Sequence, residues 1–220
     1  MDQPALHQIE ALAAERGLIV MGAFHPRQVY GPEHGTGTLV LLGTGPEFWS
    51  VFSHATEYRD GHPHAVDRWS QRVVGGLARH LDVSCSFPFG GPPYEPFIDW
   101  ALKSGRCWQS PVGMLVHDKV GLMISFRGAL HLDAAIPLPA PPVSAPCATC
   151  EAPCTVACPV GALSAEAPYD LAACHGFLDT DAGTACMTQG CAARRACPVS
   201  AGAGRTDAQS ALHMRAFHST

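Results

Sequence analysis

The cysteines are distributed unevenly, and this distribution constrains the fold more than any other feature of the sequence. Of ten cysteines in 220 residues, only Cys85 and Cys107 precede residue 147, whereas eight lie between Cys147 and Cys197. No basic stretch followed by an apolar run opens the chain, and its longest apolar runs, residues 18–21 and 39–42, are too short to span a bilayer. We therefore expect a soluble, cytoplasmic protein without a membrane partner, and in that reducing compartment clustered cysteines bind metal more often than they form disulfides.

The composition is that of a folded chain with many loops. Its 22 glycines and 19 prolines accompany 47% hydrophobic and 15% charged residues, which argues against general disorder. A net charge of −5 argues against a nucleic-acid partner that is bound by phosphate neutralisation. Five prolines in residues 137–146 predict a semi-rigid connector. We therefore divide the chain into a body at 1–136, this connector, and a cysteine-rich tail at 147–220.

Apolar spacing in the body predicts three helices and two buried strands. The helices are expected at residues 4–16, 66–81 and 94–102, where apolar residues recur every three or four positions. Short apolar runs at residues 18–21 and 38–42 lie next to glycines and predict strands that are buried on both faces.

Residues 113–116 and 121–132 predict a further pair of strands, joined by a turn at His117-Asp118-Lys119. In the second strand, Ser125, Arg127 and His131 alternate with apolar residues. This polar face could line a pocket. An ordinary solvated sheet face explains the same alternation equally well.

Four cysteines fall within twelve residues at the start of the tail. They are Cys147, Cys150, Cys154 and Cys158, and Pro159 follows the last of them. The spacing differs by one residue from the bacterial ferredoxin run C-x2-C-x2-C-x3-C-P, in which the fourth cysteine binds the other cluster. A short loop of this kind can direct several thiolates toward one metal centre.

Four further cysteines lie downstream, at Cys174, Cys186, Cys191 and Cys197, and Pro198 follows the last of them. Eight thiolates are the number that two [4Fe–4S] clusters require. Two zinc sites are the main alternative, because zinc also uses C-x2-C pairs. The second group contains no C-x2-C pair, and a Cys-Pro pair ends both groups, so the pattern favours iron–sulfur over zinc and places disulfides last.

The tail resembles that of epoxyqueuosine reductase and of the corrinoid-dependent reductive dehalogenases. The resemblance rests on CATCEAPCTVACPVGAL at 147–163, YDLAAC at 169–174, and Cys197-Pro198. In those families the cysteine of each Cys-Pro pair crosses to the other cluster. The resemblance therefore implies one cluster on Cys147, Cys150, Cys154 and Cys197, and a second on Cys158, Cys174, Cys186 and Cys191.

The body resembles the cobalamin-processing family that decyanates and dealkylates vitamin B12. The matching stretches are 37–42 with Phe48, VDRW at 66–69, and 116–121 continuing through Phe126-Arg127-Gly128. The resemblance implies a nitroreductase-like α+β fold, an antiparallel sheet flanked by helices, that binds a corrinoid. We place Arg127, His117 and Ser125 in the corrinoid pocket on this basis. The family's glutathione-binding arginines and the proton-donating acid of epoxyqueuosine reductase are not identifiable here, so neither specific activity is transferred.

Other candidate features favour ordinary structural roles. The twelve histidines are scattered, which favours surface positions over a metal site. The Gly43-x-Gly45 pair lacks the third glycine of a dinucleotide fingerprint and predicts a turn. Cys85 and Cys107 suit small core positions better than nucleophilic ones. The aromatic stretch at 87–100 could form a flat wall for a macrocycle, although core packing is the better interpretation.

The leading hypothesis is an iron–sulfur redox protein whose two clusters receive electrons from a donor and deliver them to a bound corrinoid. The corrinoid would serve reductive decyanation or dealkylation, or the reduction of a substrate. The alternative is a non-catalytic, ferredoxin-type electron-transfer protein without a corrinoid. A zinc-stabilised interaction module is a third possibility, which metal analysis separates from both.

Overall fold

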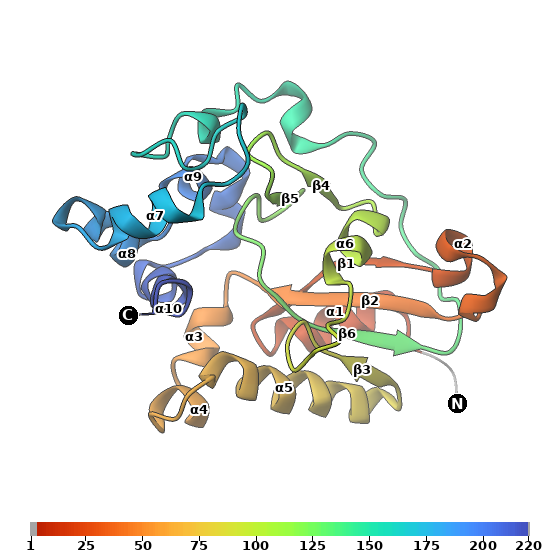
Figure 1. Ribbon diagram of the computed structural model, residues 1–220. Helices are drawn as coiled ribbons and strands as arrows, with labels where there is room; N and C mark the ends of the chain where they lie inside the picture. Colours follow the sequence, from red (N-terminus) through yellow and green to blue (C-terminus); the bar gives the residue numbers. More distant parts are fainter. Residues whose placement is uncertain (1–3, 220) are drawn as a thin grey trace. The chain divides into compact units, whose positions relative to one another are not determined.

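The computed structural model describes residues 4–219 and divides into two compact units (Figure 1). Unit 1 comprises the chain up to Cys107 together with Ser125–Val143, and unit 2 comprises Trp108–Ile124 together with the chain from Ser144 onward. Residues 108–124, which the division by sequence assigns to the body, thus group with the cysteine-rich tail. Within residues 4–219, no helix is both long and apolar enough to cross a membrane.

Unit 1 is built on a four-stranded antiparallel sheet with the order β1-β2-β6-β3. Its strands are β1 (Leu18–Phe24), β2 (Thr38–Thr44), β3 (Ser84–Ser86) and β6 (Phe126–Leu132). All seven residues of β2 are buried, as expected for an apolar strand between two neighbours. The predicted runs at 18–21 and 38–42 are therefore confirmed as strands, each two or three residues longer than the run.

In the described part of unit 1, from residue 4 onward, six helices and one 3-10 turn accompany the sheet. They are α1 (Leu6–Ala14), α2 (Pro26–Tyr30), η1 (Pro32–His34), α3 (Phe48–Phe52), α4 (Thr56–Arg59), α5 (Ala65–Leu81) and α6 (Phe97–Lys103). The three helices predicted from apolar spacing are confirmed. The third begins at Phe97, later than predicted, and Pro96 occupies its N-cap position.

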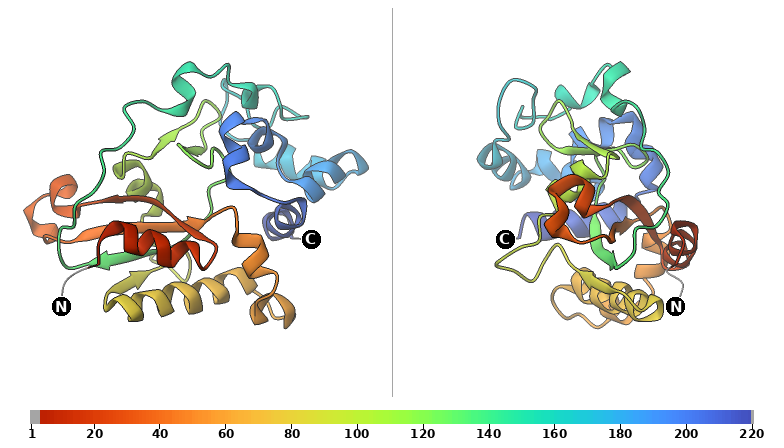
Figure 2. Two further views of the ribbon diagram at one scale, coloured as in Figure 1. Left: turned by 180° about the vertical axis from the view of Figure 1, so that it is seen from behind. Right: turned by 90° about the vertical axis from the view of Figure 1, so that its right-hand side faces the viewer.

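Helices cover both faces of the sheet. A Cβ on Gly128 of β6 would lie 2.8 Å from Val74 of α5, whereas His131 of the same strand contacts the ring of Trp100 in α6. Residues 128 and 131 point to opposite faces of a strand, so α5 and α6 lie on opposite sides of β6. The left view of Figure 2, which shows the molecule from behind, has α1 in front of the strands, on the side away from α6. Unit 1 is therefore an α+β layer structure with an antiparallel sheet flanked by helices.

The prediction that residues 113–116 and 121–132 pair as strands is wrong. Strand β5 (Leu115–His117) pairs with β4 (Cys107–Gln109), and only a single bridge joins His117 to Gly121. Strand β6 begins at Phe126 and pairs with β2 and β3 in unit 1. The apolar side chains of β6 are buried there, and alternation along one strand does not identify its partner.

Unit 2 contains short helices and 3-10 turns. They are η2 (Pro146–Thr149), η3 (Pro153–Thr155), α7 (Leu171–Leu178), η4 (Asp181–Gly183), α8 (Thr184–Gln189), α9 (Ala192–Ala196), η5 (Pro198–Ala203) and α10 (Asp207–Phe217). Their apolar side chains form two small cores. The first core consists of Val112, Val116, Leu122, Cys154, Leu163 and Ala193, and the second of Leu178, Cys186 and Met214.

The segment 117–123 packs tightly on η5 and the residues after it. The backbone N–H of Leu122 donates to Ser200 Oγ at 3.1 Å, and Arg205 donates to the Met123 carbonyl at 3.1 Å. A Cβ on Gly202 would lie 2.0 Å from the Lys119 carbonyl oxygen, so only glycine permits this approach. These contacts fix the chain that follows Cys197.

Candidate metal centres

Three cysteines of the early run and one distant cysteine form the first quartet, defined as Cys147, Cys150, Cys154 and Cys197. Cys147 lies in η2, Cys150 is its C-cap, Cys154 lies in η3, and Cys197 is the C-cap of α9. Cys197, Cys150 and Cys154 all act electrostatically on the Cys147 thiol, and Cys197 and Cys150 act on Cys154. The fold therefore brings together four cysteines that lie up to fifty positions apart.

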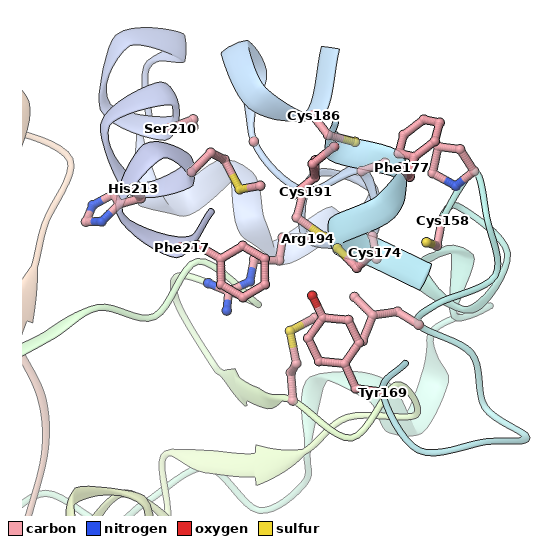
Figure 3. A pocket seen from close by; sticks show the side chains of 18 of the residues that line it. Cys158, Tyr169, Cys174, Phe177, Cys186, Cys191, Arg194, Ser210, His213 and Phe217 are labelled. Carbon is pink, nitrogen blue, oxygen red and sulfur yellow. The ribbon is translucent and has the colours of Figure 1, made fainter. Parts of the chain in front are cut away.

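The other four cysteines form the second quartet, defined as Cys158, Cys174, Cys186 and Cys191. Cys174 lies in α7, Cys186 in α8, and Cys191 is the N-cap of α9. Cys191, Cys158 and Cys186 all act electrostatically on the Cys174 thiol. The four side chains line one cavity of about 150 Å³ (Figure 3).

Two short segments run from one quartet to the other. Helix α9 has five residues, with Cys191 at one end and Cys197 at the other, and the chain from Cys154 to Cys158 makes the second passage. Six helical positions correspond to a rise of about 9 Å, which separates Cys191 from Cys197. Cys158 thus lies with the three downstream cysteines, and Cys197 lies with the three early ones. This is the same division into four and four that the family resemblance implies.

The two quartets have different surroundings. Cys154 belongs to the first apolar core, where it is 5% exposed, and Cys147 and Cys197 pack against that core. Two backbone amides hydrogen-bond to sulfurs of the first quartet. The Ala152 N–H donates to Cys150 Sγ at 3.4 Å, and the Thr155 N–H donates to Cys154. The second quartet extends from the first core, where Cys158 and Cys191 pack, to the second, which contains Cys186.

Burial raises the pKa of three of these thiols. It is the largest cause for Cys147, Cys154 and Cys174, and the negative charge of the neighbouring thiolates raises each pKa further. Tyr169 opposes this at Cys174, because its hydroxyl hydrogen-bonds the sulfur. Four thiolates held this close repel one another, and a bound cation removes that repulsion.

Four cysteine thiolates are the donor set of more than one kind of metal centre. Within residues 4–219, no three His, Cys, Asp or Glu side chains are close enough together to hold one metal ion. A structural zinc site takes four such thiolates around one ion, with zinc–sulfur distances of about 2.3 Å. A [4Fe–4S] cluster also takes four cysteine thiolates, one for each iron, and spreads them around a wider core.

Two of the three residues predicted for a corrinoid pocket lie together in unit 1. Ser125 precedes β6, and Arg127 lies at the bulge where the pairing of β2 with β6 shifts register. Arg127 donates to Asp67 at 3.5 Å, and its side chain is 14% exposed. Its buried Nε has no hydrogen-bond partner, and burial lowers the pKa of its guanidinium. A bulge redirects a side chain, and here the result is a mostly buried cation whose Nε donor is unused.

His117, the third predicted pocket residue, lies in unit 2 and is fully buried. Its Nδ1 accepts hydrogen bonds from the backbone N–H groups of Lys119 at 3.0 Å and Val120 at 3.4 Å. This side chain therefore closes the turn before Gly121. The structure does not bring it together with Ser125 and Arg127 in one unit.

Sequence reasoning did not identify Tyr169 as a residue of the site. Its hydroxyl reaches the second quartet from the loop before α7, and Arg194 of α9 acts on it electrostatically. The available signal was its position beside Asp170, which caps α7 by accepting from the Ala173 N–H at 2.9 Å. A capping residue fixes the first turn of its helix, and Cys174 lies in that turn.

No family model matches the chain, and no curated protein matches it significantly.

Proposed function

We propose that unit 2 binds two [4Fe–4S] clusters and that the chain is an iron–sulfur redox protein. The observation that carries this proposal is the grouping of eight cysteines into two quartets. Three members of each quartet come from one part of the tail, and the fourth is the Cys-Pro cysteine of the other part, Cys197 or Cys158. Eight thiolates in two such groups match the donor set of two clusters.

The chain's own residues have separate tasks in this proposal. The eight cysteine sulfurs would hold the clusters, which would supply one-electron transfer when bound. The first apolar core buries Cys154 and packs against Cys147 and Cys197, and amide N–H groups offset negative charge on Cys150 and Cys154. Exclusion of water, hydrogen bonds to sulfur and net charge are the levers by which a protein adjusts a cluster's reduction potential.

We further propose that the electron acceptor is a corrinoid held by unit 1, for reductive decyanation or dealkylation or for the reduction of a substrate. Support comes from the resemblance of the body and from Arg127, whose unused Nε donor suits an acceptor such as the amide carbonyls at the edge of a corrin ring. Ser125 lies two positions before it. We leave His117 out of this contact, because its Nδ1 already closes a turn. The cobalt chemistry belongs to the cofactor.

The experiment is performed on the full chain, purified without oxygen. Stepwise reduction should bleach the visible iron–sulfur absorption, and added cobalamin should change its own spectrum on binding and then reoxidise the reduced protein. Clusters without any cobalamin binding would support the ferredoxin-type carrier in place of the corrinoid enzyme. Zinc without iron would exclude both.

A matched pair of variants assigns the corrinoid site. Arg127→Gln keeps hydrogen-bonding groups and removes the charge, whereas Arg79→Gln changes an arginine on the exposed surface of α5. We expect at least tenfold weaker cobalamin binding for Arg127→Gln and no change for Arg79→Gln. Equal affinity for both variants would show that Arg127 does not contact the corrinoid.

A further inference from the structure

The second quartet differs from the first in having a side-chain donor aimed at one of its sulfurs. Tyr169, Cys174 and Arg194 line the same cavity, and Figure 3 shows the phenol oxygen of Tyr169 pointing across it toward Cys174. The Tyr169 hydroxyl hydrogen-bonds the Cys174 sulfur. In the first quartet, the corresponding hydrogen bonds to Cys150 and Cys154 come from backbone N–H groups.

The local backbone holds both partners of this hydrogen bond in place. The Asp170 N–H donates to the Ala162 carbonyl at 2.9 Å, and the Cys174 N–H donates to the Asp170 carbonyl at 3.1 Å. The side chain of Asp170 caps the same helix. Tyr169 and Cys174 therefore lie on either side of a fixed N-cap.

A hydrogen bond to a ligand sulfur favours the more negative state of a cluster. Reduction adds an electron, part of whose charge resides on the thiolates, and an O–H donor stabilises that charge more than it stabilises the oxidised state. Arg194 lines the same cavity and adds positive charge there. Both groups act in the same direction, toward easier reduction.

We propose that Tyr169 tunes the second cluster, raising its reduction potential through the hydrogen bond from its hydroxyl to Cys174. This inference rests on the proposed function, because it requires a cluster on the second quartet. The residue acts through the sulfur and makes no bond to metal. Its consequence is that the two clusters, although each is held by four cysteines, accept electrons at different potentials.

The test compares Tyr169→Phe with Tyr94→Phe in the anaerobically purified full chain. Tyr169→Phe keeps the ring and removes the hydroxyl, and Tyr94→Phe removes a hydroxyl from a 66% exposed side chain in unit 1. A redox titration monitored by electron paramagnetic resonance gives the midpoint potential of each cluster. One of the two potentials should become more negative in Tyr169→Phe and should not change in Tyr94→Phe. A tenfold change in the reduction equilibrium would appear as about 59 mV for one electron.

A second readout follows the proton itself. After exchange into deuterium oxide, pulsed paramagnetic resonance of the reduced protein should detect a deuteron close to one cluster, and this signal should weaken in Tyr169→Phe. Unchanged potentials and an unchanged signal, with eight irons still bound, would overturn the inference and leave the proposed function intact. Loss of four irons in Tyr169→Phe would also overturn it, because Tyr169 would then serve assembly. A wild-type protein without iron would contradict the proposed function itself.

Discussion

The two units are stabilised by different means. Unit 1 contains a sheet with three seven-residue strands and an aromatic core in which Phe48 and Phe52 pack edge-on against Trp69. Unit 2 contains two small apolar cores, short helices and 3-10 turns, and eight of its side chains are cysteines that repel one another when ionised. The difference teaches that apolar burial can account for the stability of unit 1, whereas unit 2, under the proposed function, would also depend on the clusters that its cysteines hold.

Removing the metal should therefore affect the two units very differently, and this is the largest effect that we expect. Anaerobic oxidation followed by chelation should unfold most of unit 2, because its cysteines then lose their common partner. Amide hydrogen exchange should show protection lost in α7, α8 and α9 and retained in β2 and α5. Retained protection throughout unit 2 would contradict the comparison.

Paired cysteine replacements sharpen the comparison within unit 2. The variant Cys154→Ala with Cys197→Ala changes two residues of the first quartet and should keep about four irons per chain, those of one cluster. The variant Cys154→Ala with Cys158→Ala changes one residue of each quartet and should lose nearly all iron. Iron retention in the second variant would show that consecutive cysteines share one cluster and that the ligands do not cross.

Core truncations separate stability from metal retention. Leu130→Ala in β6 and Leu122→Ala in the first core of unit 2 each remove a side chain that is at most 2% exposed. Each should lower the free energy of unfolding of its own unit by about 2–5 kcal/mol. Only Leu122→Ala should also speed the loss of iron, because Leu122 packs beside the first quartet. Circular dichroism during denaturation measures the free energy of unfolding, and the rate of iron release measures metal retention. Equal rates of iron loss in the two variants would contradict this assignment.

The smallest expected effect is a pH dependence confined to unit 1. Glu57 accepts a two-point hydrogen bond from Arg72, which holds the pKa of its carboxyl below the usual value. A lowered pKa stabilises the fold above the unfolded pKa of about 4.3, and this stabilisation is lost as the pH falls through the folded value. Glu57→Gln should cost up to about 1 kcal/mol at pH 7, because Arg72 is half exposed.

Urea denaturation of the wild type and of Glu57→Gln at pH 7 and at about pH 3 checks this expectation. The difference in unfolding free energy should shrink at the lower pH. The iron content should be equal in the two proteins, since Glu57 lies in unit 1. A difference that grew toward low pH would have the wrong sign for a carboxylate stabilised in its charged form.

The parts of unit 1 that local patterns encode could be predicted from sequence. Helix α5 follows its apolar stripe from Trp69 to Leu77, and β2 follows its run of buried residues. The pairing of β6 could not be predicted, because alternation shows which face of a strand is buried and does not show which strand lies beside it. The resulting error placed residues 121–125 in a strand that begins only at Phe126.

The candidate site was predictable to the extent that its chemistry appears in residue types. Eight cysteines and two Cys-Pro pairs indicate two metal centres, and a family resemblance supplies their division into quartets. Tyr169 and Cys174 both belong to the matching stretch YDLAAC, but residue type and spacing did not show that the Tyr169 hydroxyl reaches the Cys174 sulfur. His117 shows the opposite case, since a histidine in a matching stretch serves the turn that contains it.

The central claim is that the eight clustered cysteines hold two [4Fe–4S] clusters, and quantification of iron and acid-labile sulfide tests it most directly. The measurement uses the full chain purified without oxygen, with zinc determined on the same sample. Two clusters predict about eight irons and about eight sulfides per chain. Zinc without sulfide, or a chain free of both iron and sulfide, would contradict the account.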